Sequence, residues 1–299
     1  MNSVEQINGV GEIIGVGMLS HVPTIMLPKE VRDELNNGKE ISIIPGFHRL
    51  KKEIFDELKP DAVIVIDTHW GTLVEYCVTS HERRTGKYTS DELPRGMSQL
   101  PYDLKGDVEL SNLISEEVNN QGIRCNGIDD PYLPIHYPTI NTAHFLEDGE
   151  SWITISCAMT ADVDDNLSVG RGIAKAIEKS GKRVVIIGSG SMSHTFYPLK
   201  ELAQHEASDP KHIFTQEARE ADHQRLDWFA IGDHASVINN MDSYYQHKPE
   251  GRFAHYLMMV GAVGGEKCQA EGRLFSDYEN SVGTSQVHVW FDKPANGWV

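Results

Sequence analysis

Three short runs of apolar, mostly β-branched residues each lead into a turn that carries a histidine, and this repeated pattern constrains the fold most. The runs cover residues 13–19, 62–66 and 184–187, and the histidines that follow them are His21, His69 and His194. Uninterrupted apolar runs of this length are typical of strands that are buried on both faces of a sheet. Binding sites in α/β sheets form beyond the carboxyl ends of the strands. We therefore expect the three histidines to face one pocket.

Segments with helical spacing of apolar residues separate these runs along the chain. Helices are predicted over residues 47–58, 108–118, 166–180 and most of 209–264. Residues 23–46 are rich in Pro and Gly and are predicted to be irregular. Further strands are predicted over residues 152–158 and within 268–293, the latter around a turn at Gly283.

Alternation of strands and helices predicts the fold class and the domain organisation. We expect a single α/β domain over residues 12–299, with a central mixed β-sheet flanked by helices, after a flexible tail over residues 1–11. No internal repeat or linker interrupts the pattern. The sequence therefore predicts one domain.

Composition narrows the class of partner. Of the 299 residues, 44 are Asp or Glu and 27 are Lys or Arg, which gives a formal charge of -17. Such a charge disfavours nucleic acid and anionic membranes as partners. No signal peptide or membrane span is visible, and the dispersed cysteines predict neither a disulfide framework nor a cysteine zinc site. We expect a cytoplasmic protein with reduced cysteines at positions 77, 125, 157 and 268.

Two strand-end histidines and one carboxylate would match the facial triad of non-haem iron(II) enzymes. Three protein ligands on one side of a metal leave adjacent positions open for a substrate and dioxygen. Zinc held by two histidines and a glutamate has the same ligand types, so both metals fit the residues at this level. The residues alone do not identify the carboxylate.

Several short motifs, in order along the chain, resemble the class III extradiol dioxygenases, the family of the protocatechuate 4,5-dioxygenase β chain. Within that family the chain is most similar to enzymes that act on 3,4-dihydroxyphenylacetate. The matching residues are 21–23 (HVP), 66–70 (IDTHW), 88–94 (YTSDELP), 188–194 (GSGSMSH) and 283–286 (GTSQ). The resemblance implies Fe(2+)-dependent cleavage of a catechol ring by O2 to a muconic semialdehyde-type product, in aromatic compound catabolism.

The resemblance also implies roles for individual residues. His21 and His69 match the two metal-binding histidines, and Glu250, just ahead of an apolar segment over residues 253–263, matches the third ligand. His194 matches the acid–base histidine, which takes a proton from a substrate hydroxyl and later returns one. Tyr137 matches a second residue of the catalytic pocket.

At a few positions the sequence departs from the family pattern, and these differences bear on which substrate binds more than on the reaction. Proline follows Tyr137 where relatives have glycine, and His136 adds an imidazole next to it. Proline fixes φ and removes a backbone donor, so this loop is expected to differ in shape. The candidates for binding a ring substituent are Arg95, His136, Arg252 and His288.

Three other functions remain open from the sequence. A 2-aminophenol could replace the catechol on the same scaffold, a zinc-dependent hydrolase could use the same ligands, or the chain could be a non-catalytic partner subunit. The intact histidines argue against the last of these. The expected partners are a small aromatic substrate and O2, and either a second copy of the chain or a related subunit.

Overall fold

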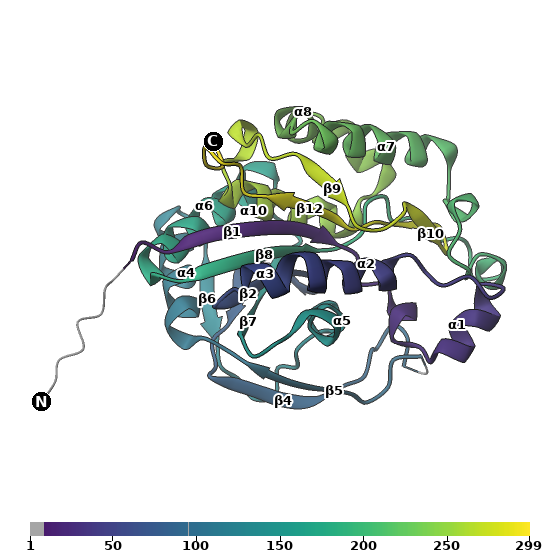
Figure 1. Cartoon of the computed structure of the whole chain (residues 1–299), viewed down its shortest axis with the longest axis horizontal. Helices are drawn as coiled ribbons and strands as arrows, with labels where there is room; N and C mark the ends of the chain where they lie inside the picture. The colour runs from purple at the N-terminus through teal and green to yellow at the C-terminus, as the bar shows by residue number, and fades with distance from the viewer. Residues whose placement is uncertain (1–8, 95) are drawn as a thin grey trace, which may run out of the picture.

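An eight-stranded mixed sheet runs through the centre of the computed structural model, which describes residues 9–94 and 96–299 (Figure 1). Its strand order is β6-β3-β7-β2-β8-β1-β12-β9. The four central strands pair in parallel, and they are β7 (Ser151–Ala158), β2 (Ala62–Thr72), β8 (Arg183–Ser189) and β1 (Glu12–Leu19). They contain the apolar runs of the sequence, as expected for strands with no solvent-facing side.

The outer strands make the sheet mixed. On one side β3 (Tyr76–Thr79) is antiparallel to β7 and parallel to β6 (Cys125–Ile128). On the other side β12 (Val289–Asp292) is antiparallel to both β1 and β9 (Gly272–Leu274). Two small hairpins lie outside the sheet, namely β4 (Arg83–Tyr88) with β5 (Leu100–Lys105), and β10 (Glu279–Ser281) with β11 (Thr284–Gln286).

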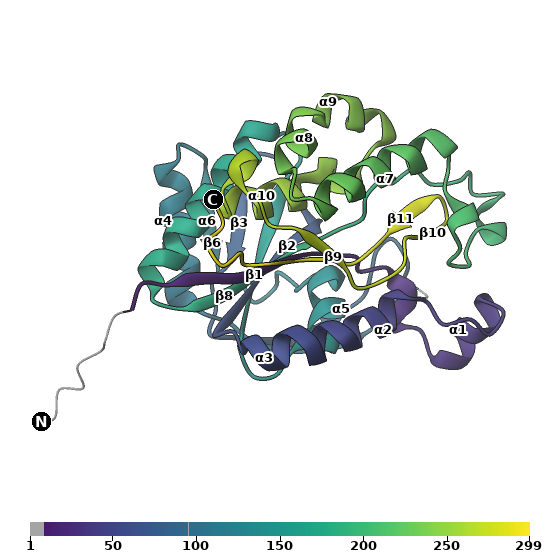
Figure 2. The same ribbon diagram turned by 45° about the horizontal axis from the view of Figure 1, so that its top comes forward.

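Helices cover both faces of the sheet (Figure 2). One face packs against α4 (Val108–Asn120), α6 (Val163–Ser180) and α10 (Ala254–Ala262), and the other against α2 (Ile43–Leu50) and α5 (Tyr137–Leu146). Successive side chains of a strand point to opposite faces. In β2, Ile64 and Ile66 join the first core, whereas Val63 and Val65 join the second.

The remaining helical segments lie in the connections. They are η1 (Pro23–Met26), α1 (Lys29–Leu35), η2 (Lys51–Phe55), α3 (Asp56–Leu58), η3 (Leu202–Gln204), η4 (Pro210–His212), α7 (Gln216–Ala230), α8 (His234–Asn239), α9 (Met241–Tyr244), η5 (Tyr245–His247), η6 (Glu250–Phe253) and η7 (Gly265–Lys267). None of the helices in the described ranges is long and apolar enough to cross a membrane. All four cysteines are free and buried.

The fold class predicted from the sequence is confirmed, with differences in detail. The region over residues 23–46 contains short helices, and the helix predicted from residue 47 begins at Ile43 and continues through a π turn to Leu58. Pro45 lies in the first turn of this helix, where its missing N–H group would have no partner anyway. The short strands β3 to β6 were not predicted. Residues 1–8 of the predicted tail lie outside the described residues.

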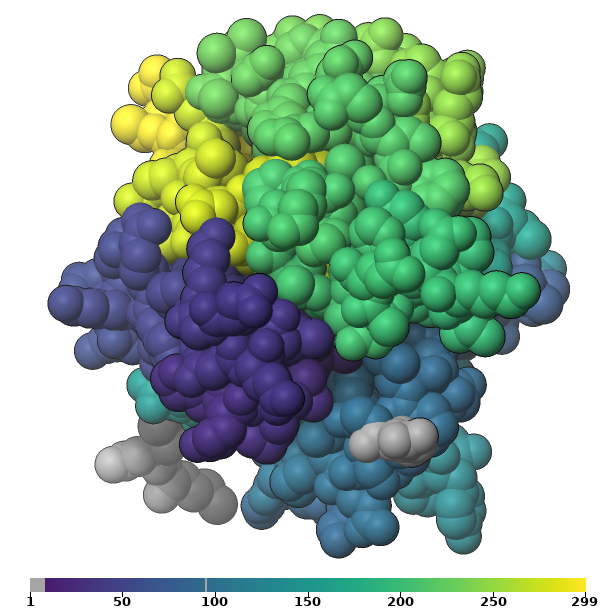
Figure 3. Space-filling view, turned by 90° about the vertical axis from the view of Figure 1, so that its right-hand side faces the viewer, coloured from purple at the N-terminus to yellow at the C-terminus, as the bar shows by residue number. Residues whose placement is uncertain are grey.

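Three adjacent central strands share one row of the sheet, at which β1 and β8 end and the pairing of β2 with β8 stops. Ser189 of β8 pairs with Leu19 of β1 on one side and with Asp67 of β2 on the other. The residues that follow this row in the three strands therefore lie at the same end of the sheet. Figure 3 faces this end of the molecule, where segments distant in sequence, coloured purple, blue and green, meet at the surface.

Candidate active site

His21 lies two residues beyond the row formed by Leu19, Ser189 and Asp67, in the turn after β1. Its side chain is buried, and its Nδ1 lies 2.9 Å from the Oγ of Ser189. The Nδ2 of Asn141 donates to the His21 carbonyl at 2.9 Å. Backbone and ring are thus both fixed, and Nε2 is the ring nitrogen left to face the pocket.

His69 is brought to the same level by an irregularity inside β2. Asp67 pairs with Ser156 of β7, but Gly71 pairs with the next residue, Cys157, so that three residues of β2 are looped out of the ladder. Bulges of this kind redirect side chains and occur often beside active sites.

The looped-out segment is held by the fully buried carboxylate of Asp67. Its Oδ1 accepts the backbone N–H groups of His69 and Trp70 at 3.0 and 3.2 Å. Its Oδ2 accepts the backbone and hydroxyl donors of Thr139 in α5, at 3.2 and 2.8 Å. One buried carboxylate therefore fixes both the segment that carries His69 and the first turn of α5.

Glu250 reaches the site from the distant segment before α10. Its backbone N–H donates to the carbonyl of Met192 at 3.1 Å, and its Oε2 accepts the backbone N–H of Ser191 at 2.6 Å. The next residues, Gly251 and Arg252, have φ of 54° and 56°. Left-handed backbone is uncommon for residues with side chains and is frequent at functional sites.

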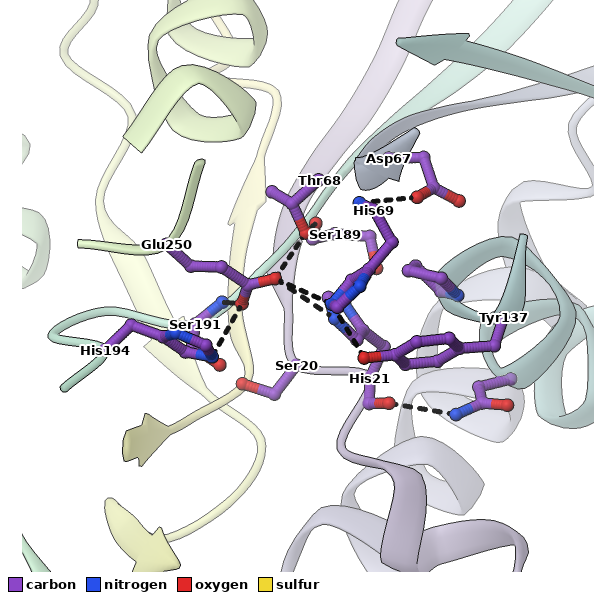
Figure 4. A network of polar contacts seen from close by, with 12 residues as sticks. Ser20, His21, Asp67, Thr68, His69, Tyr137, Ser189, Ser191, His194 and Glu250 are labelled. Atoms are coloured by element: carbon purple, nitrogen blue, oxygen red, sulfur yellow. Dashed lines mark hydrogen bonds and ion pairs between the residues drawn. The ribbon is translucent and has the colours of Figure 1, made fainter. Parts of the chain in front are cut away.

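The side chains of His21, His69 and Glu250 converge on one point (Figure 4). The Oε1 of Glu250 lies 3.3 Å from Nε2 of His21 and 3.2 Å from Nε2 of His69, and the two rings are nearly perpendicular. Ligand atoms about 2.1 Å from one metal and at right angles to each other lie about 3.0 Å apart. These distances therefore fit a shared divalent cation, and no other such group occurs in the described part of the chain.

The charges around this point favour a cation. Burial raises the pKa of Glu250, but the imidazoles of His21 and His194 lower it by more than burial raises it. The pKa of Glu250 is therefore well below its usual range. Burial lowers the pKa of His69, but the carboxylates of Glu250 and Glu92 raise it to about 10. Two carboxylates thus stabilise positive charge at this site, and a divalent metal would supply such charge.

His194 lies on the opposite side of Glu250, with its Nε2 4.0 Å from Oε2 (Figure 4). Burial lowers the pKa of His194. A largely neutral imidazole near pH 7 is able to accept a proton.

The backbone beside His194 is held by the buried carboxylate of Asp222 in α7. This carboxylate accepts the N–H of Ser193 at 3.1 Å and, each at 2.7 Å, the hydroxyls of Ser193, Tyr244 and Tyr278. His194 itself pairs with Thr284 of the β10–β11 hairpin. The predicted acid–base residue is therefore fixed from two sides.

Tyr137 is the first residue of α5, and its hydroxyl lies 2.7 Å from Nε2 of His69. The ring is buried, and burial raises the pKa of its hydroxyl far above the usual range. The hydroxyl therefore keeps its proton and is a donor on the side where the ligand atoms converge.

The residues predicted to bind a ring substituent are more dispersed. The ring of His136 lies between Trp70 and Tyr88, with centroids 6.3 and 5.9 Å away. Arg252 is exposed, and its guanidinium lies 4.6 Å from the ring centre of Tyr245. Arg95 lies outside the described residues.

His288 is fully buried and is engaged at both ring nitrogens. Its Nδ1 accepts the N–H of Ser20 at 3.2 Å, and its Nε2 lies 3.2 Å from the carbonyl oxygen of Ile43. In this position it supports the residue before His21 and has no free nitrogen for a ligand. Its predicted role in substrate binding stays a prediction.

The sequence did not single out the residues that hold the ligands in place. The Oγ of Thr68 donates to Oε1 of Glu250 at 2.5 Å, and Ser189 and Ser191 contact His21 and Glu250. All three lie inside the motifs that suggested the family, and their position beside a ligand residue was the available signal. Asn141 lies outside those motifs and gave no signal.

The chain is similar to proteins of one known family. Residues 15–291 match the family described as the catalytic LigB subunit of aromatic ring-opening dioxygenase. The chain is 27% identical over 272 residues to 3,4-dihydroxyphenylacetate 2,3-dioxygenase from Escherichia coli, across 89% of this chain and 95% of that protein.

Two further relatives are the subunits of 2-aminophenol 1,6-dioxygenase from Pseudomonas sp. The alpha subunit is 27% identical, and the match covers 69% of this chain and 76% of the alpha subunit. The beta subunit is 28% identical, and the match covers 62% of this chain and 63% of the beta subunit. Among solved structures, the uncharacterized protein JW3007 from Escherichia coli K12 has a similar fold. Its TM-score is 0.61 at 15% identity, over 93% of this chain and 99% of that one.

Proposed function

Because this chain belongs to the family of the catalytic LigB subunit of aromatic ring-opening dioxygenases, and so is a ring-cleaving dioxygenase, we propose that it acts with iron(II) on a catechol. The proposed substrate resembles 3,4-dihydroxyphenylacetate, and the product is of the muconic semialdehyde type. The observation that supports this most is the convergence of His21, His69 and Glu250 on one point, with His194 beside them.

In the proposed function His21, His69 and Glu250 hold the metal. Two imidazoles and one carboxylate on one side are the donor set of non-haem iron(II) oxygenases. Iron bound there supplies the redox-active centre at which a catechol and dioxygen meet. The protein's part is to fix the donors, which it does through the hydrogen bonds of Ser189 and Ser191 and the looped-out segment of β2.

His194 is the proposed acid–base residue. Catechols are weak acids, so a base close to the ligand atoms helps one hydroxyl lose its proton as the substrate binds. The Nε2 of His194 lies 4.0 Å from Oε2 of Glu250, and burial lowers the pKa of His194, which keeps the ring neutral before the transfer. The same imidazole returns the proton later in the reaction.

Tyr137 is proposed to donate a hydrogen bond inside the pocket. Its hydroxyl remains protonated because burial raises its pKa, and it lies on the same side as the ligand atoms. A neutral donor stabilises negative charge that develops on an oxygen atom without itself giving up its proton.

Coverage of the relatives favours a catechol over an aminophenol. The relative that acts on 3,4-dihydroxyphenylacetate matches 89% of this chain, against 69% and 62% for the two subunits that act on 2-aminophenol. Identity is almost equal in the three cases, so 2-aminophenol is the second candidate substrate. A zinc-dependent hydrolase would use the same donors but would not consume oxygen.

One experiment separates these functions. The protein is loaded with iron(II) without oxygen, and oxygen uptake is then followed with 3,4-dihydroxyphenylacetate, other catechols and 2-aminophenol. We expect one O2 consumed per molecule of the preferred catechol and a yellow product near neutral pH. The His21→Ala variant, which lacks one proposed donor, serves as control and should neither retain iron nor consume oxygen.

Other results would change the proposal in different ways. Faster turnover of 2-aminophenol than of every catechol would change the proposed substrate to an aminophenol but leave the proposed ring cleavage unchanged. Absence of oxygen uptake by the iron-loaded protein with all compounds would overturn the proposal. Hydrolytic activity with zinc and no oxygen uptake would favour the zinc enzyme.

We also propose that the chain assembles into an oligomer. Two of its relatives are alpha and beta subunits, which makes pairing with a second copy or a related chain a reasonable expectation. Light scattering of the purified chain gives its mass in solution. Turnover by this chain alone would show that no related subunit is required, and a monomeric mass would contradict the assembly.

A further inference from the structure

Each of the three proposed metal ligands has a polar group that contacts its side chain. Two of these groups come from one strand and the turn after it, and the third comes from a different segment. The Oγ of Ser189 lies against Nδ1 of His21, and the backbone N–H of Ser191 donates to Oε2 of Glu250. Both partners belong to β8 or to the turn that follows it. The partner of His69 is Glu92, which comes from the connection between β4 and β5.

Glu92 is placed against the nitrogen of His69 that faces away from the proposed metal. Its Oε1 lies 3.4 Å from Nδ1, while Nε2 of the same ring lies 3.2 Å from Oε1 of Glu250. The distance of 3.4 Å is that of an ion pair, slightly beyond a full hydrogen bond. The Glu92 side chain is 57% exposed and therefore has room to approach the ring.

The backbone that carries Glu92 is well fixed although it lies outside the sheets. Ser90 is fully buried, its N–H donates to the carbonyl of Met97 at 2.9 Å, and its Oγ accepts the N–H of Leu93 at 3.1 Å. Met97, also buried, donates back to the carbonyl of Leu93 at 2.9 Å. Glu92 lies between Ser90 and Leu93, two residues that these hydrogen bonds hold in place.

From this geometry we propose that Glu92 is a positioning residue for His69 and sets the affinity of the site for its metal. This inference rests on the proposed function, because it takes His69 as a ligand. A histidine that binds a metal through Nε2 carries its proton on Nδ1, and a carboxylate that accepts a hydrogen bond from this N–H group fixes the tautomer and the ring orientation. It also makes Nε2 a stronger donor. Glu92 performs this task for His69, as Ser189 does for His21.

The test measures metal affinity in the absence of substrate and oxygen. Co2+ is titrated into the full-length chain under nitrogen, and its dissociation constant is obtained from the visible absorption of the bound ion. Loss of a carboxylate behind a ligand histidine weakens metal binding about 10- to 100-fold. We expect a loss in this range for Glu92→Ala and a smaller loss for Glu92→Gln, whose amide oxygen still accepts a hydrogen bond from the Nδ1–H group.

The neighbouring carboxylate provides a matched control. Asp91 is exposed, lies in the same turn and carries the same charge, and Asp91→Asn should change the dissociation constant by less than about threefold. Equal constants for Glu92→Ala and Asp91→Asn would overturn the proposal. The melting temperature of each variant without metal reports whether the turn is still folded.

A spectroscopic signature separates orientation of His69 from a general effect on the turn. In the Co2+ protein the exchangeable Nδ1 protons of His21 and His69 give separate, strongly shifted proton resonances. In Glu92→Ala the His69 signal should exchange faster with water while the His21 signal stays unchanged. If the exchange rate of the His69 proton in Glu92→Ala equalled that in the unsubstituted protein, the assigned role would be contradicted.

The His69→Ala variant distinguishes failure of this inference from failure of the proposed function. If Co2+ binding survives in His69→Ala, His69 is not a ligand and the proposed metal site is wrong. If His69→Ala loses Co2+ but Glu92→Ala retains wild-type affinity, only the role of Glu92 is refuted.

Discussion

The buried carboxylate of Asp222 is the clearest place to test how the scaffold supports His194. Asp222 is fully buried in α7 and accepts four hydrogen bonds, two of them from Ser193, the residue before His194. The other two come from the hydroxyls of Tyr244 and Tyr278. Replacement by alanine removes both carboxylate oxygens, so that four donors lose their acceptor at once, and leaves a small void.

The expected cost follows from the donors that remain. A buried donor without a partner costs about 1–3 kcal/mol. The hydroxyls are able to turn toward other acceptors, but the backbone N–H of Ser193 is not. We therefore expect Asp222→Ala to lower the free energy of unfolding by roughly 3–5 kcal/mol, a large part of the 5–15 kcal/mol typical of folded proteins.

Asp222→Asn should be milder, for a geometric reason. The amide oxygen can keep the bonds from the Ser193 N–H and from Tyr244, which share Oδ1 in the native protein. The amide nitrogen then faces the hydroxyls of Ser193 and Tyr278, and both can rotate to accept from it. The remaining loss is that of charge, which we expect to cost about 1–2 kcal/mol.

Urea unfolding followed by circular dichroism measures these differences. Asp227, an exposed carboxylate of the same helix, supplies the control, and Asp227→Ala should stay within about 0.5 kcal/mol of the parent. An Asp222→Ala protein as stable as the Asp227→Ala protein would refute the reasoning. The asparagine variant should also turn over substrate more slowly at unchanged Co2+ affinity, because Ser193 adjoins His194 and not a proposed ligand.

Three further predictions concern the site and its surroundings. His194→Gln should keep its iron, measured by metal analysis, and lose at least about 100-fold in turnover; an unchanged rate would remove its acid–base role. Gly190→Ala should destabilise the protein, because an added Cβ would lie 2.6 Å from the buried ring of His255; an unchanged melting temperature would contradict this. Burial lowers the pKa of His255 and His288 to about 4 and 3, so both are neutral in the folded protein and protonated in the unfolded chain below about pH 6.5. Stability should therefore fall as the pH decreases from about 6.5 toward 4, and a flat melting temperature over that range would argue against it.

Local sequence patterns were sufficient to predict the four central strands and the histidines that follow three of them. A buried parallel strand is recognisable from its apolar run, and the position of His21 just after such a run needs no tertiary information. The strand β3 is buried but only four residues long, and β4 to β6 are short and partly exposed, so the patterns of these strands carry little signal. The helix that begins at Ile43 starts earlier than predicted, because the Pro and Gly residues within 23–46 predict an irregular segment up to residue 46.

The contacts that complete the site depend on residues far apart in the chain. Glu250 is separated from His21 by 229 positions, as the residue numbers give, and only the resemblance to a family indicated it. Glu92 contacts His69 because the turn between β4 and β5 folds back onto the strand ends. Side-chain packing at such a distance leaves no periodic trace in the sequence.

The looped-out residues of β2 also separate the scaffold from the chemistry. Asp67 and Gly71 pair with consecutive residues of β7, so removal of residues 68–70 would leave a ladder with no interruption. A chain shortened in this way would keep the register of its central strands and would lose one proposed ligand, His69, together with Thr68. Catalysis in this fold would then depend on a three-residue insertion, and a shortened version would be an inactive but folded relative.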